Sequence, residues 1–162
     1  MPAFPPLLIA EDDAQDMFLF TRLLQATGAL HALHIALDGR DAIRLLTPVV
    51  GQSRLVAKPA VAFLDVALPE IGGLEVLTWI RQHRELDDLP VVMMATTPDS
   101  ASIARAARLG AQCFVAKFPG KASMARLLQN APQFTGRDGV HIFDLPENLL
   151  RSHAAKTYYP PR

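Results

Sequence analysis

Acidic side chains stand directly after two apolar runs of the sequence. Glu11, Asp12 and Asp13 follow LLIA, and Asp65 follows AVAFL. Carboxylates in such a cluster repel each other unless a cation neutralises them. Mg²⁺ prefers oxygen ligands and typically takes one or two protein carboxylates together with phosphate oxygens. The cluster therefore predicts a site for Mg²⁺.

A phosphoryl group is the second partner that this set of residues suits. A carboxylate can accept a phosphoryl group covalently, and Asp65 is the natural nucleophile because it stands alone after its apolar run. Phosphoryl transfer depends mostly on positioning and on neutralising the equatorial oxygens. Mg²⁺ and the ammonium of Lys117 would provide that neutralisation, and Thr96 and Thr97 would add hydroxyl groups.

The spacing of apolar residues predicts the elements that must position these side chains. Short apolar runs at 7–10, 34–37, 61–64, 91–95 and 114–116 predict strands. Between them, apolar residues three and four apart predict helices with one buried face. Those helical residues are Met17, Phe20, Leu24, Ala42, Leu45, Leu46, Leu74, Leu77, Ile80, Ile103, Ala106, Ala107, Met124, Leu127 and Leu128. We interpret residues 48–59 as a loop.

Strand–helix alternation repeated five times predicts an α/β fold, a parallel sheet with helices on both faces, over residues 6–130. Ligands of such sheets bind beyond the carboxyl ends of the strands. We therefore expect Glu11, Asp12, Asp65, Thr96 and Lys117 at one edge. A single acid after a strand is usually a helix N-cap, and we assign that role to Asp13.

Composition limits the classes of function. The 162 residues hold 16 Lys and Arg against 16 Asp and Glu, so there is no basic bias that would predict nucleic-acid binding. No apolar stretch is long enough for a membrane span, and MPAFPPLL lacks the basic start of a secretory signal. The single Cys113 fits a reducing compartment. We expect a soluble, cytoplasmic protein.

Several motifs together resemble a known family. IAEDD, ALDGRDAIRLL, AFLDVALPEIGG, LPVVMMATT and AARLGAQCFVAK occur in this order. Over residues 6–130 the sequence resembles a response-regulator receiver domain of two-component signalling. The resemblance implies a flavodoxin-like fold, with a doubly wound, five-stranded parallel sheet of strand order 2-1-3-4-5.

The resemblance also implies a role for each acidic residue. Asp65 would be the phosphoacceptor, and Glu11 and Asp12 would be the acid pair. Asp12 would ligate Mg²⁺ directly, and Glu11 would act mainly through water. The backbone carbonyl of Ala67 would be a further metal ligand.

The switch residues follow the family pattern only in part. Lys117 would bind the phosphoryl group, and Phe114 occupies the aromatic switch position. The family usually has Thr or Ser where this sequence has Ala95. Thr96 stands one residue later, so the coupling hydroxyl is missing unless Thr96 replaces it.

These residues predict a stand-alone response regulator that takes a phosphoryl group from a sensor histidine kinase and signals through conformational change and protein contacts. Its only catalysis would be its own phosphorylation and dephosphorylation. The alternative is a pseudo-receiver that signals without phosphate, which Ala95 favours and the intact Asp12, Asp65 and Lys117 oppose. A phosphatase would need a second acid where Ala67 stands.

The final segment, residues 131–162, is too short for a second domain. Its apolar residues, among them Ile142, Phe143 and Tyr158, need a surface to cover. We expect it to mediate docking or a homodimer; the alternative is that it folds back on its own domain. The long connection before the third predicted strand and the ATT and KFP details resemble single-domain receivers that serve bacterial phytochromes, so a bacteriophytochrome is the expected kinase.

Overall fold

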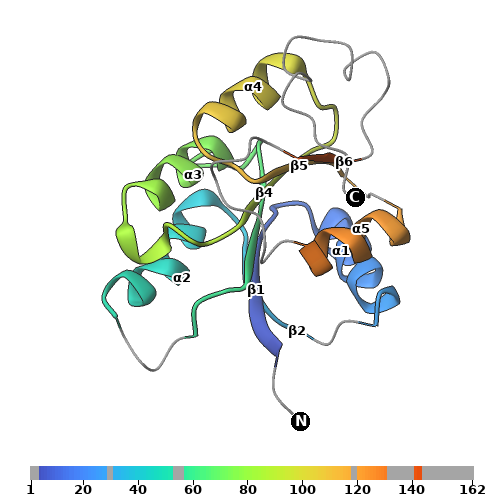
Figure 1. Cartoon of the computed structure of the whole chain (residues 1–162), viewed down its shortest axis with the longest axis horizontal. Helices are drawn as coiled ribbons and strands as arrows, with labels where there is room; N and C mark the ends of the chain where they lie inside the picture. Colours follow the sequence, from blue (N-terminus) through green and yellow to red (C-terminus); the bar gives the residue numbers. More distant parts are fainter. Residues whose placement is uncertain (1–3, 29–30, 53–56, 118–119, 131–140, 144–162) are drawn as a thin grey trace.

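The computed structural model describes residues 4–28, 31–52, 57–117, 120–130 and 141–143. They form one six-stranded sheet of order β2-β1-β3-β4-β5-β6 (Figure 1). Every neighbouring pair of strands is parallel. The strands are β1 (Phe4–Ala10), β2 (His31–Ala36), β3 (Val61–Asp65), β4 (Val91–Ala95), β5 (Cys113–Ala116) and β6 (His141–Phe143).

The first five strands confirm the predicted order 2-1-3-4-5. The sixth strand was not predicted, because three residues are too few to show a readable alternation. β6 pairs in parallel with β5 and so lies along what would otherwise be the sheet's edge. The rest of the predicted extension, 131–140 and 144–162, lies outside the described residues, and its role in docking or dimerisation stays a prediction.

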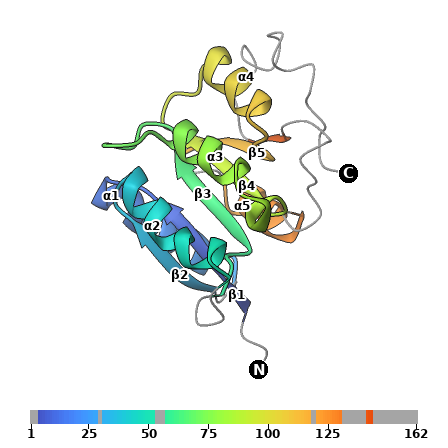
Figure 2. The same cartoon turned by 90° about the vertical axis from the view of Figure 1, so that its left-hand side faces the viewer.

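Helices cover both faces of the sheet, as the alternation predicts. They are α1 (Ala14–Ala26), α2 (Gly39–Val50), α3 (Gly73–Arg81), α4 (Ser100–Arg108) and α5 (Lys121–Asn130), with a short 3₁₀ helix η1 (Arg84–Leu86). α1 and α5 lie on one side of the sheet, and α2, α3 and α4 lie on the other (Figure 1). Figure 2 shows α2 and α3 in front of the strands.

The two faces of the sheet belong to two apolar clusters, because successive strand residues point to opposite sides. Leu64 and Phe114 face the cluster under α2, α3 and α4. Phe63 and Val115 face the cluster under α1 and α5. On this second side Phe20 of α1 meets Phe63 edge-on, with ring centroids 4.9 Å apart and an interplanar angle of 67°. This contact fixes α1 against the centre of the sheet.

The helix α2 begins where the sequence predicts, but it ends later than predicted. Asp38 caps the helix, since its side chain accepts a hydrogen bond from the backbone N–H of Asp41 at 2.7 Å. The prediction of a loop from residue 48 was wrong, because α2 continues through Pro48 to Val50. A proline in the last turn removes one backbone hydrogen bond and leaves the preceding turns intact.

Two glycines allow backbone segments to touch where a side chain would not fit. A Cβ on Gly39, the first residue of α2, would overlap the carbonyl oxygen of Ile71. A Cβ on Gly73, the first residue of α3, would overlap the carbonyl oxygen of Asp65. Close backbone contacts therefore join the start of α3 to the end of β3 and press the loop between them, at Ile71, against the start of α2.

At the end of the sheet where the strands begin, Arg81 joins several segments. Its guanidinium donates hydrogen bonds to the backbone carbonyls of Leu86 at 3.1 Å, Leu89 at 3.0 Å and Gly110 at 3.1 Å. It also donates to the side-chain oxygen of Gln112 at 2.8 Å. Burial lowers the pKa of Arg81, and the charges of nearby acids partly offset that effect. One side chain thus ties the end of α3 to the starts of β4 and β5.

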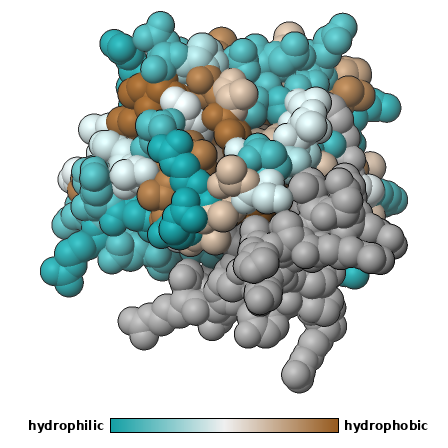
Figure 3. Space-filling model, turned by 90° about the horizontal axis from the view of Figure 1, so that it is seen from above, coloured by the Kyte–Doolittle hydropathy of each residue, from teal (hydrophilic) through white to brown (hydrophobic). Residues whose placement is uncertain are grey.

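Few large apolar side chains of the described residues are exposed. They are Phe18 and Leu19 of α1, Ile35 of β2, and Leu37 directly after β2. Figure 3, which looks at the molecule from above, shows a mostly hydrophilic surface with apolar side chains gathered in part of it. Among the described helices, none has the length and apolar character required to cross a membrane.

Candidate functional site

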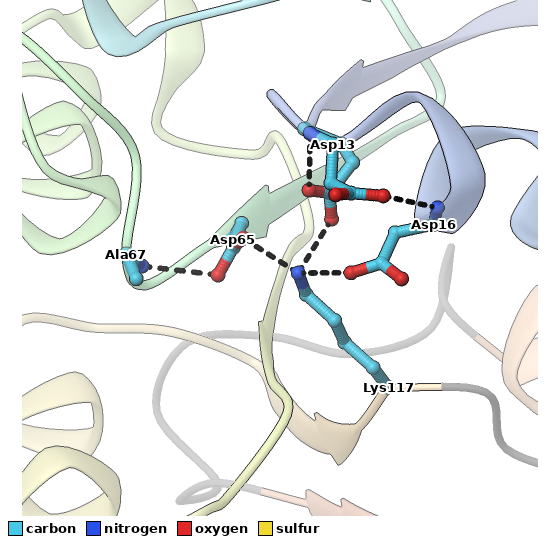
Figure 4. Close-up of polar contacts among 6 residues, drawn as sticks. Asp13, Asp16, Asp65, Ala67 and Lys117 are labelled. Carbon is cyan, nitrogen blue, oxygen red and sulfur yellow. Dashed lines mark hydrogen bonds and ion pairs between the residues drawn. The ribbon is translucent and has the colours of Figure 1, made fainter.

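Lys117 is the centre of the site. It follows β5, and its backbone N–H donates to the carbonyl of Ala95 at 2.8 Å, which continues the pairing of β5 with β4. Its ammonium lies 2.7 Å from Asp65 Oδ2, 2.8 Å from Glu11 Oε2 and 2.9 Å from Asp16 Oδ2 (Figure 4). The side chain is only 8% exposed. Strand ends and a helix that are far apart in sequence therefore converge on one cation.

The predicted acid cluster forms on the same side. Glu11, Asp12 and Asp65 each offer a carboxylate oxygen, and these oxygens all lie within 4.8 Å of one another. Glu11 and Asp65 are buried, and Asp12 is exposed. This arrangement suits a hard divalent cation, because all its donors are oxygens and the exposed side leaves room for water or phosphate ligands.

Backbone N–H groups orient the two buried carboxylates. Glu11 Oε1 accepts a hydrogen bond from the N–H of Asp13 at 3.0 Å. Asp65 Oδ1 accepts one from the N–H of Ala67 at 3.0 Å. The oxygens that face Lys117 are thus fixed by contacts made through the other oxygen of each carboxylate. Figure 4 shows Ala67 and Lys117 on different sides of Asp65.

Burial and charge act in opposite directions on the ionisable groups. Burial alone would lower the pKa of Lys117, but hydrogen bonds to Asp65, Glu11 and Asp16 outweigh it and raise that pKa. Burial raises the pKa of Glu11, and the hydrogen bonds from Lys117 and from the N–H of Asp13 only partly offset this. Lys117 is therefore firmly cationic, whereas the ionised form of Glu11 carries a cost that a bound cation would reduce.

The predicted switch residues lie next to this cluster. Ala95 ends β4 and is half-buried, and it packs against the same apolar cluster that contains the fully buried Phe114. Thr96 is exposed. Ala95 and Phe114 thus share one face of the sheet. The roles assigned to Ala95, Thr96 and Phe114, and the metal-binding carbonyl of Ala67, stay predictions.

Asp13 is confirmed as the cap of α1, because its side chain accepts from the N–H of Asp16 at 2.9 Å. Sequence reasoning missed the side chain of Asp16, which pairs with Lys117. A signal was present in the helical spacing. Asp16 lies four residues before the buried Phe20 and so belongs to the same face of α1, one turn nearer the strand ends.

The site combines the carboxylate of Asp65, a cluster of carboxylate oxygens and a buried ammonium within hydrogen-bond distance of that carboxylate. Such a set can hold a divalent cation and can neutralise the oxygens of a phosphoryl group. All of these groups lie at the carboxyl ends of β1, β3 and β5 or at the start of α1. This is the edge where open parallel sheets bind ligands.

Comparison with known proteins agrees with this geometry. Response regulator Rcp1 of Synechocystis sp. is 28% identical over 132 residues, which are 80% of this chain and 89% of that protein. The solved structure of the bacteriophytochrome response regulator AtBRR is similar with a TM-score of 0.69 and 30% identity, covering 80% of this chain and 94% of that one. The Mn²⁺-bound form of Rcp1 is similar with a TM-score of 0.64 and 27% identity, covering 81% and 94%.

A family model describes the core of the chain directly. It is the model of the response regulator receiver domain, and it matches residues 7–129. The match includes all five predicted strands and the residues that converge on Lys117. The chain therefore belongs to the response regulator receiver domain family.

Proposed function

We propose that this chain is a stand-alone response regulator that accepts a phosphoryl group on Asp65 in a Mg²⁺-dependent reaction. The main support is the placement of Lys117 Nζ 2.7 Å from Asp65 Oδ2, beside the oxygen cluster of Glu11, Asp12 and Asp65. A nucleophile, a cation-binding set and a fixed positive charge meet at one point. That combination is what phosphoryl transfer to a carboxylate requires.

In the proposed step, a carboxylate oxygen of Asp65 forms a bond to phosphorus. The bond between phosphorus and the donor's leaving atom breaks, and the leaving group keeps the electron pair. Lys117 exchanges its contact with Asp65 for one with a phosphoryl oxygen, which stabilises the charge there. Glu11, Asp12, Asp65 and the carbonyl of Ala67 would hold Mg²⁺, which supplies further charge neutralisation when bound.

We infer that the donor is a sensor histidine kinase, and that a bacteriophytochrome is the kinase to test first. The support is the similarity to Rcp1 and to AtBRR, which is named a bacteriophytochrome response regulator. In the proposed role, the phosphorylated chain passes the signal to another protein through a change of conformation. No added substrate is turned over.

The second candidate is a pseudo-receiver that signals without phosphate. The observation that favours it is Ala95, which places a methyl group where receivers usually carry a hydroxyl. The complete set of Glu11, Asp12, Asp65 and Lys117 at one edge opposes it, because a protein that never binds phosphate has no use for that convergence of charge.

Phosphorylation with acetyl phosphate tests the proposal. We expect the wild-type chain to gain the mass of one phosphoryl group with Mg²⁺ and not with EDTA, and Asp65→Asn to gain none. The matched control is Asp88→Asn, which removes an exposed carboxylate that pairs with Lys58 at the opposite edge of the sheet. It should be labelled like the wild type.

Labelling of Asp65→Asn at the wild-type rate would show that another residue accepts the phosphoryl group. If the folded wild type is not labelled either by acetyl phosphate or by any purified histidine kinase, the pseudo-receiver is the better description. Circular dichroism of each variant checks that the fold is intact.

A further inference from the structure

Asp16 contacts Lys117 but lies outside the candidate metal-binding cluster. Lys117 has three close carboxylate partners, and two of them, Glu11 and Asp65, belong to that cluster. Asp16 is the third, at 2.9 Å. An ammonium has three N–H donors, so each carboxylate can accept one hydrogen bond. The lysine is thus fully satisfied only when Asp16 takes part.

The fold holds Asp16 in place for this contact. Its backbone N–H is bound by the cap residue Asp13 at 2.9 Å, which fixes the first turn of α1. Phe20, one turn further on the same face, packs edge-on against Phe63 of β3. Asp16, Phe20 and Lys117 also line one small cavity, together with Ile9, Glu11 and Met94. The side chain of Asp16 is 25% exposed, so its charge is partly shielded from water.

The contacts of Lys117 with its three carboxylate partners would change to different extents in the proposed reaction. An Asp65 oxygen would become bonded to phosphorus, and Glu11 and Asp65 would both take part in holding Mg²⁺. Asp16 neither accepts the phosphoryl group nor belongs to the metal cluster. It is the partner whose contact with Lys117 does not have to change.

We propose that Asp16 is a positioning residue that holds the Lys117 ammonium over Asp65 before and after phosphorylation. The inference rests on the proposed function of the site. With Asp16 as the fixed partner, Lys117 exchanges an Asp65 oxygen for a phosphoryl oxygen without leaving the site. Without Asp16, the ammonium can move towards Glu11 or water and is over Asp65 for less of the time. Fewer encounters with a phosphoryl donor then lead to phosphorylation.

The experiment compares initial rates of phosphorylation by acetyl phosphate with Mg²⁺ in the full chain. Asp16→Asn keeps the shape and removes the charge, and we expect a rate about tenfold lower, because a neutral amide oxygen holds the ammonium more weakly than a carboxylate does. Asp16→Glu should recover part of the rate. The control is Asp88→Asn, which removes an exposed carboxylate that pairs with Lys58 at the end of the sheet where the strands begin. It should stay within about twofold of the wild type.

A double-mutant cycle separates positioning from a general effect on the fold. If Asp16 acts through Lys117, Asp16→Asn should slow the wild type but have no further effect in Lys117→Met. Equal slowing in both backgrounds would overturn the proposal and leave the proposed function standing. Absence of any labelling of the wild type would overturn the proposed function, and this inference with it.

Two readouts do not depend on phosphorylation. In ¹⁵N-lysine spectra the ammonium of Lys117 should exchange protons with water measurably faster in Asp16→Asn than in Asp88→Asn. The affinity for Mg²⁺, measured by titration with Mg²⁺ alone, should change by less than about threefold in Asp16→Asn, since Asp16 lies outside the candidate metal-binding cluster. Unchanged lysine exchange, or a tenfold loss of Mg²⁺ affinity, would contradict the positioning role.

Discussion

Two cations, Lys117 and Arg81, hold opposite edges of the same sheet, and their partners differ in kind. Lys117 lies where the strands end and is surrounded by three carboxylates. Arg81 lies where β4 and β5 begin and is surrounded by three backbone carbonyls and the amide oxygen of Gln112. One cation therefore has charged partners on movable side chains, and the other has neutral partners that are mostly part of the backbone.

Because of this difference, the end of the sheet that holds Lys117 can change its contacts, whereas the end that holds Arg81 cannot. Carboxylates can exchange an ammonium for a divalent cation or a phosphoryl group, because each of these neutralises the same oxygens. The carbonyls around Arg81 have no such substitute, so losing the guanidinium leaves them without that donor. We infer that the fold depends on Arg81 for stability and uses Lys117 for chemistry.

The largest expected effect is on the free energy of unfolding, and it distinguishes the two edges. We expect Arg81→Met to lower it by about 4 kcal/mol, since several hydrogen bonds to a charged donor are lost at once. Lys117→Met should lower the free energy of unfolding by only about 2 kcal/mol without metal. The effect is smaller because Glu11 can take up a proton when its counter-ion is removed. Urea denaturation with and without Mg²⁺ measures both.

Mg²⁺ should restore most of the stability of Lys117→Met, since the cation takes over the neutralisation of the carboxylates. It should stabilise Arg81→Met no more than it stabilises the wild type. If Mg²⁺ fails to stabilise Lys117→Met, or if Arg81→Met is as stable as the wild type, the proposed division between the two edges is wrong.

A smaller effect is expected on the affinity of the acidic cluster beside Lys117 for Mg²⁺. Asp12→Ala should weaken Mg²⁺ binding by about thirtyfold, or about 2 kcal/mol, because it removes the exposed carboxylate of the cluster. Stability without metal should not fall, since this side chain is exposed. Isothermal titration, with Asp88→Asn as the control, measures the affinity. An unchanged affinity in Asp12→Ala would place the metal elsewhere.

The smallest expected effect is on the conformational response to phosphorylation, or to a phosphoryl mimic, at Asp65. Ala95 supplies only a methyl group on the face that it shares with Phe114. Ala95→Thr should shift the balance between inactive and active conformations by about tenfold in the presence of beryllofluoride, because it adds a hydrogen-bond donor to the phosphoryl position. Thr96→Ala should change little, since Thr96 is exposed.

NMR chemical shifts of Phe114 would report the conformational balance in both variants. If Thr96→Ala removes the response to beryllofluoride, then Thr96 supplies the missing hydroxyl and the role assigned to position 95 is wrong.

Much of the fold could be predicted because its elements repeat a local pattern. Phe20 and Leu24 mark the buried face of α1 by their spacing, and Asp65 marks the end of a fully buried strand. β6 and the last turn of α2 could not be predicted in this way. The strand is too short to show a pattern, and Pro48 is a helix breaker whose effect depends on its position within the helix.

The site was predictable where it consists of strand ends and less so where it draws on a helix. Glu11, Asp12, Asp65 and Lys117 follow apolar runs, so the parallel sheet alone brings them together. Asp16 meets Lys117 only because of the angle at which α1 packs on the sheet. That angle comes from side-chain packing such as the contact of Phe20 with Phe63, which no local pattern specifies.

The close backbone contacts at Gly39 and Gly73 limit how this sequence can vary. Any larger residue at either position would have to displace the loop that follows Asp65, although neither glycine carries a group that takes part in the chemistry. A library of random substitutions should therefore lose the labelling of Asp65 at these two positions nearly as completely as at Asp65 itself. Mutational intolerance in this chain should therefore mark places where two backbones meet, as well as reactive side chains.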